Sequence, residues 1–397
     1  MSHPFLLTLN AGSSSVKIGL FKADAGVARE IGRGVLDLQR QPLALRLTAQ
    51  GTSSEITLDA PVSDDLHAVL DATLVALGAH FDLGELLGAG HRVVHGGMRF
   101  HGPVRIDAAS LAAIHALTPL APLHQPHSLR LIRALRHLRP GLPQTASFDT
   151  AFHVTQADLV RRFALPRALH DEGIRRYGFH GLSYLYIARQ LARREPMLTA
   201  GRVVAAHLGS GASLCAMQGG RSVDSSMGFS TLDGVPMGTR CGNLDAGVVL
   251  YLLDERRMAV KEVEDLLYHR SGLLGVSGSS GDVRTLEGEA GAAAREALDL
   301  FALRVAGEAA RLASTLGGID ALVFTAGIGE HDAAMRAAIC ARLAWLGVGL
   351  DTAANSRHAE RIEASGSRVA VLVIPTDEEQ VIADEALGLL GTRTERP

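Results

Sequence analysis

The chain has 397 residues, of which 47% are apolar, and this length predicts two or three domains with a sizeable core. Its 39 basic and 42 acidic side chains leave a net charge of −3, with lysine only at Lys17, Lys22 and Lys261. This balance argues against a nucleic-acid-binding or membrane-binding surface. Glycine occurs 43 times, so many backbone positions need the freedom that a β-carbon would deny.

The three cysteines, Cys215, Cys241 and Cys340, lie far apart in the sequence and imply no disulfide framework. A reducing compartment fits them best. The first eight residues carry no basic segment or cleavage pattern, and no apolar run approaches the ~18 residues of a membrane-spanning helix. We therefore expect a soluble, cytoplasmic protein.

Short apolar runs alternate with longer amphipathic stretches along the chain, which predicts an α/β fold with a parallel or mixed sheet. In chain order, the predicted strands are 5–9, 92–95, 144–148, 202–207, 321–325 and 368–374. The stretches 292–316 and 333–346 repeat apolar residues at helical spacing and stop at glycine, so we expect a helix in each.

Two segments about half a chain apart are similar. Residues 7–15 and 204–212 share an apolar strand followed by a polar residue, a glycine and a serine. A duplicated α/β unit is one interpretation and coincidence is the other. The boundary between two such units would lie near residues 150–200.

The first of these segments continues into a glycine–serine turn that contains Asn10, Gly12, Ser13, Ser15 and Lys17. Free backbone N–H groups, hydroxyls and a lysine neutralise a phosphate group without steric cost. The turn therefore predicts phosphate binding, with a plain hairpin as the alternative.

Further glycine-rich segments lie at 207–213, 275–284 and 324–330, and the first and last of them place two glycines in a turn after a buried strand. Backbone can approach a ligand closely at such turns. The chain has no Gly-Lys dipeptide, which excludes a Walker A loop, and it lacks the His-Arg-Asp and Asp-Phe-Gly motifs of protein kinases. If the protein binds a nucleotide, it uses another architecture.

Two arginines lie beside glycine-rich turns. Arg92 begins a predicted strand, and Arg240 follows the glycine-rich segment 227–239. A guanidinium can bind a phosphoryl or carboxylate group through two parallel hydrogen bonds, although a solvated surface charge is the alternative.

The 17 histidines show no zinc-like spacing. His124 lies in a proline-rich loop, which is poor support for a metal site, whereas His180 lies between glycines in the segment 177–181 and is more suggestive of function.

Two carboxylates follow apolar strands. Asp149 ends the strand 144–148, and Glu378 lies one residue inside a helix that starts after the strand 368–374. The second carboxylate could stabilise the helix dipole, but its place after an apolar strand would also allow it to hold Mg²⁺ in a cleft.

Taken together, these segments resemble the acetate kinases, which are ATP-dependent carboxylate kinases of the sugar kinase, Hsp70 and actin superfamily. The matching stretches are 10–17, 91–97, 121–124, 148–153, 177–181, 207–213, 226–242, 272–284, 323–330 and 375–379. They span nearly the whole chain in order, and only about residues 22–85 lack a distinctive signature.

The resemblance implies two duplicated RNase H-like (actin-like ATPase) domains with a cleft between them. The N-terminal domain would comprise 1–150 and 380–397, and the C-terminal, nucleotide-binding domain would comprise 151–379. It further implies a homodimer and the reversible transfer of a phosphoryl group from ATP to acetate, which gives acetyl phosphate and ADP.

The resemblance also implies roles for individual residues. Asn10 and Glu378 would serve Mg²⁺, with Mn²⁺ as a substitute, and Asp149, His180 and Arg240 would be catalytic. The substrate-binding residues would be Arg92, Lys17, Val94, Leu123, Phe179 and His124, and the phosphate loop would use Gly12, Ser13 and Ser15. The nucleotide would be lined by His207, Leu208, Gly209, Ser210, Gly211, Asp282, Val283, Arg284, Gly327, Ile328, Gly329, Glu330 and His331.

The chain departs from the family pattern at several of these places. The family commonly has Asn at position 210, Thr at 182, His at 184, Pro at 231 and Asn at 377, where this chain has Ser210, Leu182, Tyr184, Thr231 and Asp377. Thr231 would line the small acyl pocket, and one methylene is worth only ~1–3 kcal/mol in such a pocket. A propionate or other short-chain acyl kinase is therefore one alternative, and a non-catalytic actin-like or Hsp70-like nucleotide switch is another.

Overall fold

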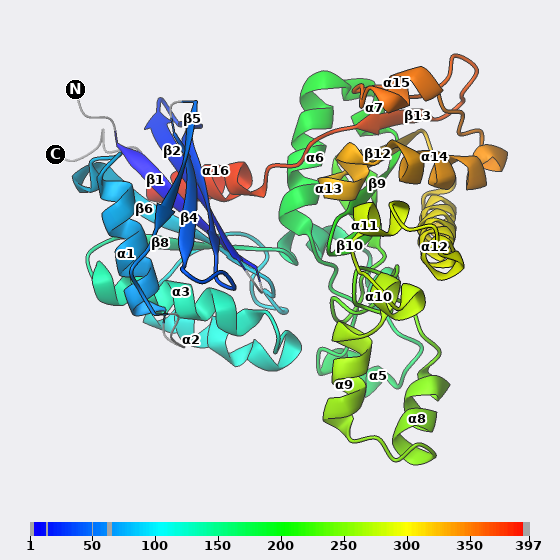
Figure 1. Cartoon of the computed structure of the whole chain (residues 1–397), viewed down its shortest axis with the longest axis horizontal. Helices are drawn as coiled ribbons and strands as arrows, with labels where there is room; N and C mark the ends of the chain where they lie inside the picture. The colour runs from blue at the N-terminus through cyan, green and yellow to red at the C-terminus, as the bar shows by residue number, and fades with distance from the viewer. Residues whose placement is uncertain (1–3, 13–14, 50, 62–65, 392–397) are drawn as a thin grey trace. The chain divides into compact units, whose positions relative to one another are not determined.

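Figure 1 shows a computed structural model of the chain, which describes residues 4–12, 15–49, 51–61 and 66–391. The chain forms two compact units. The first consists of Met1–Phe152 together with Asp377–Pro397, and the second of His153–Thr376. Glu378 therefore belongs to the same unit as Asn10, although 368 positions separate them.

The first unit contains a mixed sheet with the strand order β5-β4-β3-β2-β1-β6-β8-β7. Strands β1 to β5 are antiparallel neighbours, whereas β1, β6 and β8 are parallel. The described strands are β1 (Phe5–Ala11), β2 (Ser15–Asp24), β3 (Val27–Asp37), β4 (Ala44–Ala49), β5 (Thr52–Thr57), β6 (Leu86–Val93), β7 (Val104–Arg105) and β8 (Gln144–Phe148). The helices are α1 (His67–Gly78), α2 (Ala108–Ala116), α3 (Gln125–Leu138) and α16 (Glu378–Leu390).

Strand β1 is buried on both faces. Leu7 and Leu9 belong to the core that α1 and α3 complete, whereas Leu6 packs with residues of α16. Because side chains alternate along a strand, Asn10 lies on the same face as Leu6 and is directed towards α16. The register of one strand therefore brings Asn10 to the beginning of a distant helix.

The second unit contains a smaller mixed sheet with the order β11-β10-β9-β12-β13. Its described strands are β9 (Arg202–Leu208), β10 (Ala212–Gln218), β11 (Arg221–Ser225), β12 (Ala321–Thr325) and β13 (Ala370–Val373). Its helices are α4 (Asp158–Arg161), α5 (Arg167–Asp171), α6 (Gly181–Arg194), α7 (Pro196–Ala200), α8 (Ala246–Asp254), α9 (Val260–His269), α10 (Gly272–Ser277), α11 (Val283–Glu287), α12 (Ala292–Leu316), α13 (Ala326–His331), α14 (Ala333–Arg342) and α15 (Thr352–Ser356). Helices α6 and α12 lie on opposite sides of this sheet (Figure 1).

The two sheets share one topology. In β3-β2-β1-β6-β8 and in β11-β10-β9-β12-β13, three antiparallel strands are followed by two strands parallel to the first. The similar segments 7–15 and 204–212 occupy the same place, since each begins in the first strand of its set and ends at the first residue of the second strand. The predicted duplication of an α/β unit is confirmed.

Several predicted elements have the expected limits, including β8, β12 and α12, but three expectations are wrong. Arg92 does not begin a strand, because β6 runs from Leu86 and ends at Val93. The glycines at 327 and 329 do not form a turn, because α13 starts directly after β12. The helix expected at 333–346 ends at Arg342, and a short 3₁₀ turn covers Ala344–Leu346. No helix in the described part of the chain is long and apolar enough to span a membrane.

Candidate active site

Three predicted residues of the first unit meet where parallel strands end. Asn10 lies near the end of β1, Arg92 is the penultimate residue of β6, and Asp149 follows β8. Arg92 donates to Asp149 through Nε at 2.9 Å and through Nη2 at 2.6 Å, and its Nη1 donates to Asn10 Oδ1 at 3.1 Å. Binding sites of α/β sheets commonly lie at this edge. The structure thus joins an amide, a guanidinium and a carboxylate that the sequence places far apart.

Asn10 also contacts the start of α16. Its Nδ2 donates to Glu378 Oε2 at 3.0 Å and to Glu379 Oε1 at 2.8 Å. Asp377 caps the helix by accepting the N–H of Gln380 at 2.8 Å. The helix N-terminus favours the two adjacent carboxylates in its first turn. Glu379, which the sequence analysis did not select, therefore belongs to the same cluster as Glu378.

Burial and pairing act in opposite directions on the charges of this cluster. Burial raises the pKa of Asp149, and the Arg92 guanidinium opposes that rise. For Arg92, burial lowers the pKa, but Asp149 and Glu378 outweigh it and the pKa is raised. The pKa of Glu379 is likewise raised by burial, and the positive charge of Lys17 offsets only part of that rise. Arg92 therefore stays cationic, and its charge favours a carboxylate at Asp149.

The other selected residues of the first unit that the structure describes lie on β2, in the β1–β2 hairpin, or in the segment that follows β6. Lys17 is exposed on β2 and pairs in register with Asn10. Gly12 and Ser15 close the β1–β2 hairpin, in which the Gly12 N–H donates to the Ser15 carbonyl at 2.8 Å. Ser13 lies outside the described residues. Three others lie along the chain beyond β6: buried Val94, half-buried Leu123, and His124, the residue before α3.

In the second unit, His180, Gly211 and Arg240 come together. A β-carbon at Gly211 would lie 3.2 Å from His180 Nε2 and 3.6 Å from Arg240 Nη2. The His180 ring stacks on His207, with 4.3 Å between the ring centroids. Arg240 Nη1 donates to the Thr231 carbonyl at 2.9 Å. Two potential donors to an anion thus lie beside a glycine, where a ligand can approach closely.

The backbone at His180 is held in an unusual conformation. His180 has a φ of 55°, in the left-handed region, and directly precedes α6. The buried His153 donates from Nε2 to the carbonyl of the preceding Phe179 at 2.9 Å. A non-glycine residue keeps this backbone only where its surroundings impose it, and such residues gather at functional sites.

The predicted nucleotide-binding segments differ in which of their atoms a ligand could contact. Gly209–Gly211 form the tight β9–β10 hairpin, with the Gly209 N–H donating to the Gly211 carbonyl at 3.1 Å, and Ser210 is exposed. Leu208 and Val283 are buried in the core, so only their backbone could contact a ligand. Asp282 caps α11 and pairs with exposed Arg284 at 2.7 Å.

The third nucleotide segment forms α13. Its Glu330 Oε1 accepts the N–H groups of Ala326 at 2.8 Å and Thr376 at 3.1 Å, which ties the segment to the chain that follows β13. Gly327 is exposed and Ile328 half-buried, whereas Gly329 is buried. His331 is 75% exposed at the end of the helix. The exposed N-terminal part of α13 is therefore the part that a ligand could reach.

The sequence profile of the acetokinase family matches residues 5–384. The chain belongs to this family. An acetate kinase from Methylocella silvestris is 47% identical over 394 residues, which cover 97% of this chain and 98% of that protein. One from Rhodopseudomonas palustris is 49% identical over 386 residues, which cover 95% of this chain and 96% of that protein.

Solved structures of acetokinase relatives share the fold over almost the whole chain. A propionate kinase from Francisella tularensis has a TM-score of 0.89 at 36% identity, covering 98% of this chain and 100% of that one. An acetate kinase from Porphyromonas gingivalis has a TM-score of 0.86 at 32% identity, with the same coverage. The chain is therefore an α/β protein with two actin-like ATPase domains.

The acetokinase resemblance implies Mg²⁺, and the cluster around Asn10 can be tested against it. Mg²⁺ prefers oxygen ligands and is usually held by one or two carboxylates, with phosphate and water oxygens as the rest. Glu378 and Glu379 supply two such carboxylates, both of which accept hydrogen bonds from the Asn10 amide nitrogen. The described residues hold no group of three or more His, Cys, Asp or Glu suited to a metal. The donor set fits a Mg²⁺ ion that completes its coordination on a phosphate.

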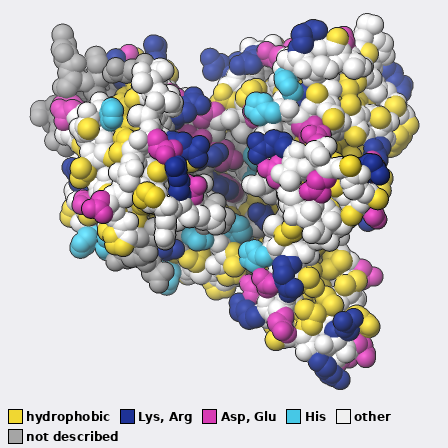
Figure 2. Space-filling model, viewed as in Figure 1, with side chains coloured by type: hydrophobic (Ala, Val, Ile, Leu, Met, Phe, Trp, Pro, Cys, Tyr) yellow, Lys and Arg dark blue, Asp and Glu magenta, His cyan; other side chains and the backbone are white. Residues whose placement is uncertain are grey.

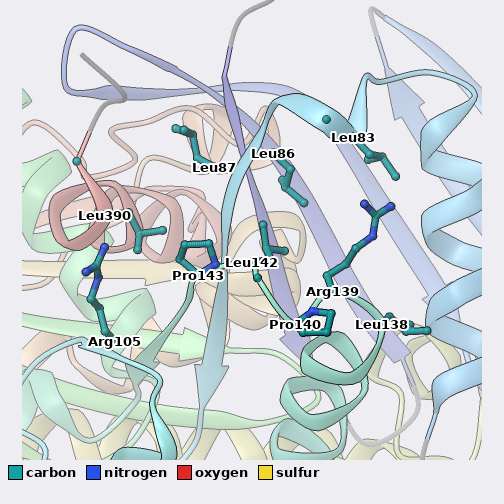
Figure 3. Close-up of a pocket in the computed structure, with 13 residues that line it drawn as sticks. Leu83, Leu86, Leu87, Arg105, Leu138, Arg139, Pro140, Leu142, Pro143 and Leu390 are labelled. Carbon is teal, nitrogen blue, oxygen red and sulfur yellow. The ribbon is translucent and has the colours of Figure 1, made fainter. Parts of the chain in front are cut away.

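A cavity of about 600 Å³ lies beside the first residues of β6 (Figure 3), whereas Arg92 is near the end of that strand. Leu86 and Leu87 of β6 line it, together with Arg105, Arg139 and Leu390. None of the acetokinase residues selected above lines this cavity. It is therefore distinct from the candidate active site.

Sequence reasoning missed several residues that form hydrogen bonds with the selected residues. Besides Glu379, these are His153, Ser183, Tyr184 and Ser213, all of which bond directly to a selected residue or to its backbone. Ser213 and His153 lie inside stretches that carry the acetokinase resemblance, so they could have been selected from the sequence. Ser183 and Tyr184 follow such a stretch. Ser183 gave no signal of its own, and Tyr184 was noted only as a departure from the family pattern.

Proposed function

We propose that the chain catalyses the reversible, Mg²⁺-dependent phosphorylation of acetate by ATP, with acetyl phosphate and ADP as products, by in-line transfer of the phosphoryl group. The observation that carries this proposal is family membership over residues 5–384. Curated acetate kinases at 47% and 49% identity over nearly the whole chain support it. The side-chain clusters of each unit supply groups suited to such a transfer.

We assign the binding of the acetate carboxylate to Arg92. Acetate is already ionised at neutral pH, so the attacking oxygen needs no general base. Asp149 holds two of the guanidinium nitrogens and thereby sets the direction in which Arg92 presents its remaining N–H groups. Asp149 then controls geometry rather than removing a proton. Lys17 and His124 would add positive charge and hydrogen bonds around the substrates.

We assign the stabilisation of the migrating phosphoryl group to Arg240 and His180. Catalysis of phosphoryl transfer depends mainly on alignment and on charge stabilisation, and one arginine can be worth ~10³–10⁵ in rate. Both side chains lie within 4 Å of one position beside Gly211. This shared position is where an anionic group would receive both interactions.

We assign the binding of Mg²⁺, of the nucleotide and of its phosphates to the segments described above. Mg²⁺ would be held by Glu378, with Asn10 and Glu379 beside it, and would neutralise phosphate charge when bound. ATP and ADP would lie along the backbone of Gly209–Gly211, the segment 282–284 and α13. Gly12, Ser13 and Ser15 would contribute the phosphate loop. Because the described cysteines are free thiols, we also propose a reducing, cytoplasmic location.

The acyl preference is the part of the function with a specific alternative. The acyl group would contact Val94, Leu123, Phe179 and Thr231, and a solved relative with a TM-score of 0.89 is a propionate kinase. The curated relatives are acetate kinases at higher identity, so we propose acetate as the preferred substrate.

The test is a coupled assay of ADP formation with purified protein, Mg-ATP and acetate, propionate or butyrate. We expect the highest kcat/KM for acetate. A higher value for propionate would make the chain a propionate kinase. ADP formation that no carboxylate stimulates would refute the kinase proposal and favour a nucleotide switch.

We also propose a homodimer that uses α8. None of the α8 residues is buried, although the helix is largely apolar. Leu250 is 66% exposed and Tyr251 is 53% exposed. Figure 2 shows hydrophobic side chains among charged ones over α8 and α9, at the lower end of the view. Exposed apolar patches of this kind commonly mark interfaces.

Light scattering after size exclusion tests the dimer. The wild type should have twice the mass of one chain, and Leu250→Glu with Tyr251→Glu should give monomers. Leu159→Glu is the matched control, because Leu159 is 83% exposed in the same unit but lies outside α8. A monomeric wild type would refute the proposal.

A further inference from the structure

A buried tyrosine lies behind His180. Tyr184 is on the first turn of α6, and its side chain is fully buried. Its hydroxyl lies 2.6 Å from Ser213 Oγ, and Ser213 Oγ lies 2.8 Å from His180 Nδ1. The Tyr184 ring packs edge-on against His153, with 5.8 Å between the ring centroids. Three side chains of one unit therefore form a hydrogen-bonded chain that ends on the histidine.

The chemistry of the donors determines which group donates in each of these two hydrogen bonds. A backbone hydrogen bond with His207 lowers the pKa of the Tyr184 hydroxyl, and only an N–H donor favours the phenolate in this way, so the Tyr184 oxygen accepts this bond. Tyr184 therefore keeps its own hydrogen to donate to Ser213, and a phenol is the stronger donor when it faces an aliphatic hydroxyl. Ser213, having accepted that bond, has its single hydrogen free to donate to His180 Nδ1.

The direction determines which nitrogen of neutral His180 carries the proton. If Nδ1 accepts from Ser213, the hydrogen must be on Nε2. His180 Nε2 is the nitrogen that lies 3.2 Å from the β-carbon position at Gly211, beside Arg240. An Nε2–H would donate to an anion at that position, whereas an Nε2 lone pair would repel it.

We propose that Tyr184 is a positioning residue that acts through Ser213 to hold His180 as the Nε2–H tautomer. The consequence for phosphoryl transfer rests on the proposed function, but the tautomer itself does not. Among the described residues, the charged or titratable groups that face His180 from neighbouring elements include His207 of β9, Arg240 and Tyr184.

The experiment is nitrogen NMR of protein labelled with ¹⁵N-histidine, without substrates and above the titration range of histidine. The His180 signals are identified by their loss in a His180→Gln variant. We expect a protonated Nε2 and an unprotonated Nδ1 in the wild type. Tyr184→Phe removes the hydrogen bond between Tyr184 and Ser213, and Ser213→Ala also removes the one between Ser213 and His180. Each variant should shift His180 towards the Nδ1–H form.

Tyr177→Phe is the matched control, since it also removes a buried tyrosine hydroxyl, which donates to the Gly173 carbonyl at 2.8 Å. It should leave the His180 nitrogen shifts unchanged. A wild type with its proton on Nδ1 would overturn the proposal. Unchanged His180 shifts in both Tyr184→Phe and Ser213→Ala would overturn it as well, and if one variant does not fold, the other decides.

Kinetics provide a separate readout. Loss of one buried hydrogen bond in the chain should lower kcat of Tyr184→Phe by about 3- to 10-fold, with little change in KM for acetate or ATP. An unchanged kcat, or a loss confined to KM, would count against the role in transfer. If the wild type had no acetate-dependent turnover, the proposed function would fail while the NMR result on the tautomer stood.

Discussion

The Arg92 guanidinium and the Asp149 carboxylate form a bidentate ion pair across the ends of the adjacent parallel strands β6 and β8. The Nε–Oδ1 and Nη2–Oδ2 distances are 2.9 Å and 2.6 Å, and the Asp149 side chain is only 1% exposed. Such a fork fixes the guanidinium plane, which a lysine ammonium could not reproduce. The pair therefore orients the one cation of this cluster that we assign to the substrate carboxylate.

We predict that Arg92→Ala lowers kcat/KM for acetate at least ~10²-fold in the coupled assay. Because this variant leaves Asp149 buried without its partner, Arg92→Lys is measured beside it. The lysine variant keeps the charge but loses the fork, and we expect at least ~10-fold loss. Circular dichroism checks that both variants fold.

Arg202→Ala is the control for Arg92→Ala. Arg202 forms a similar bidentate pair with Asp320, at 3.0 Å and 2.6 Å, but it lies at the start of β9, away from the selected residues. It should keep near-normal turnover. Near-normal turnover of folded Arg92→Ala would remove Arg92 from the proposed mechanism.

We predict that Arg240→Ala also lowers turnover at least ~10²-fold, because it removes the cation beside His180 Nε2. The control is Arg270→Ala, whose exposed side chain pairs with Asp265 at 2.6 Å. Steady-state assays over a range of acetate and Mg-ATP concentrations separate kcat from KM. A folded Arg240→Ala variant with a raised KM but an unchanged kcat would contradict a role in stabilising the migrating group.

We predict that Gly178→Ala is more damaging than an ordinary glycine substitution. Gly178 has a φ of +84°, and a β-carbon there would lie 2.5–2.9 Å from atoms of the His153 ring. His153 holds the Phe179 carbonyl just before His180, so the clash should displace both. We expect a loss of about 2–4 kcal/mol in stability and at least ~10-fold in turnover.

Gly219→Ala isolates the contribution of that clash. Gly219 also has a positive φ, of +58°, but no atom lies within 4 Å of its β-carbon position. It should lose only about 1 kcal/mol and keep its activity. Equal losses in the two variants, measured by urea unfolding, would show that the contact with His153 has no effect.

The strands show which parts of the fold could and could not be predicted from the sequence. Strands β8 and β12 are buried throughout and were predicted with their observed limits. Strand β6 was missed at its start because it contains glycines: a β-carbon at Gly88 would collide with Leu390, and one at Gly90 with Ile382. Both partners lie on α16, about 300 residues further along the chain. No local pattern reveals a glycine required by such a distant helix.

The candidate site shows the same division. The type of residue was predictable wherever a glycine turn or strand end stood beside a charge, as at Arg92, Asp149 and His180. Partners such as Glu379 for Asn10, or Tyr184 for Ser213, depend on which faces of distant elements meet. Burial of those faces is set by the sheet register and not by neighbours in sequence.

We predict that acid destabilises the protein through its buried histidines. Burial lowers the pKa of His91, His95 and His153 to about 4, from an ordinary value of 6.5. A histidine whose folded-state pKa is depressed stabilises the fold fully above pH 6.5 and loses that contribution as the pH falls towards 4. Each should contribute roughly 3 kcal/mol over this window.

Urea unfolding midpoints at pH 7, 5.5 and 4.5 measure this effect. His91→Gln removes one titrating group and should reduce the fall in the midpoint, whereas the exposed His101→Gln should not. If the midpoints of wild type and His91→Gln fall in parallel, burial of His91 is not a source of the acid sensitivity.

We predict, finally, that Thr231→Ala moves the acyl preference towards propionate. Thr231 is 8% exposed, and its backbone carbonyl accepts a hydrogen bond from Arg240 that the alanine variant keeps. The shorter side chain gives room for one more methylene, which is worth ~1–3 kcal/mol in an apolar pocket. We expect the ratio of kcat/KM for propionate to that for acetate to rise about 3- to 10-fold. The control is Thr199→Ala, a half-buried threonine on α7 that should leave the ratio unchanged. An unchanged ratio in Thr231→Ala, with acetate turnover preserved, would show that Thr231 does not limit the size of the acyl group.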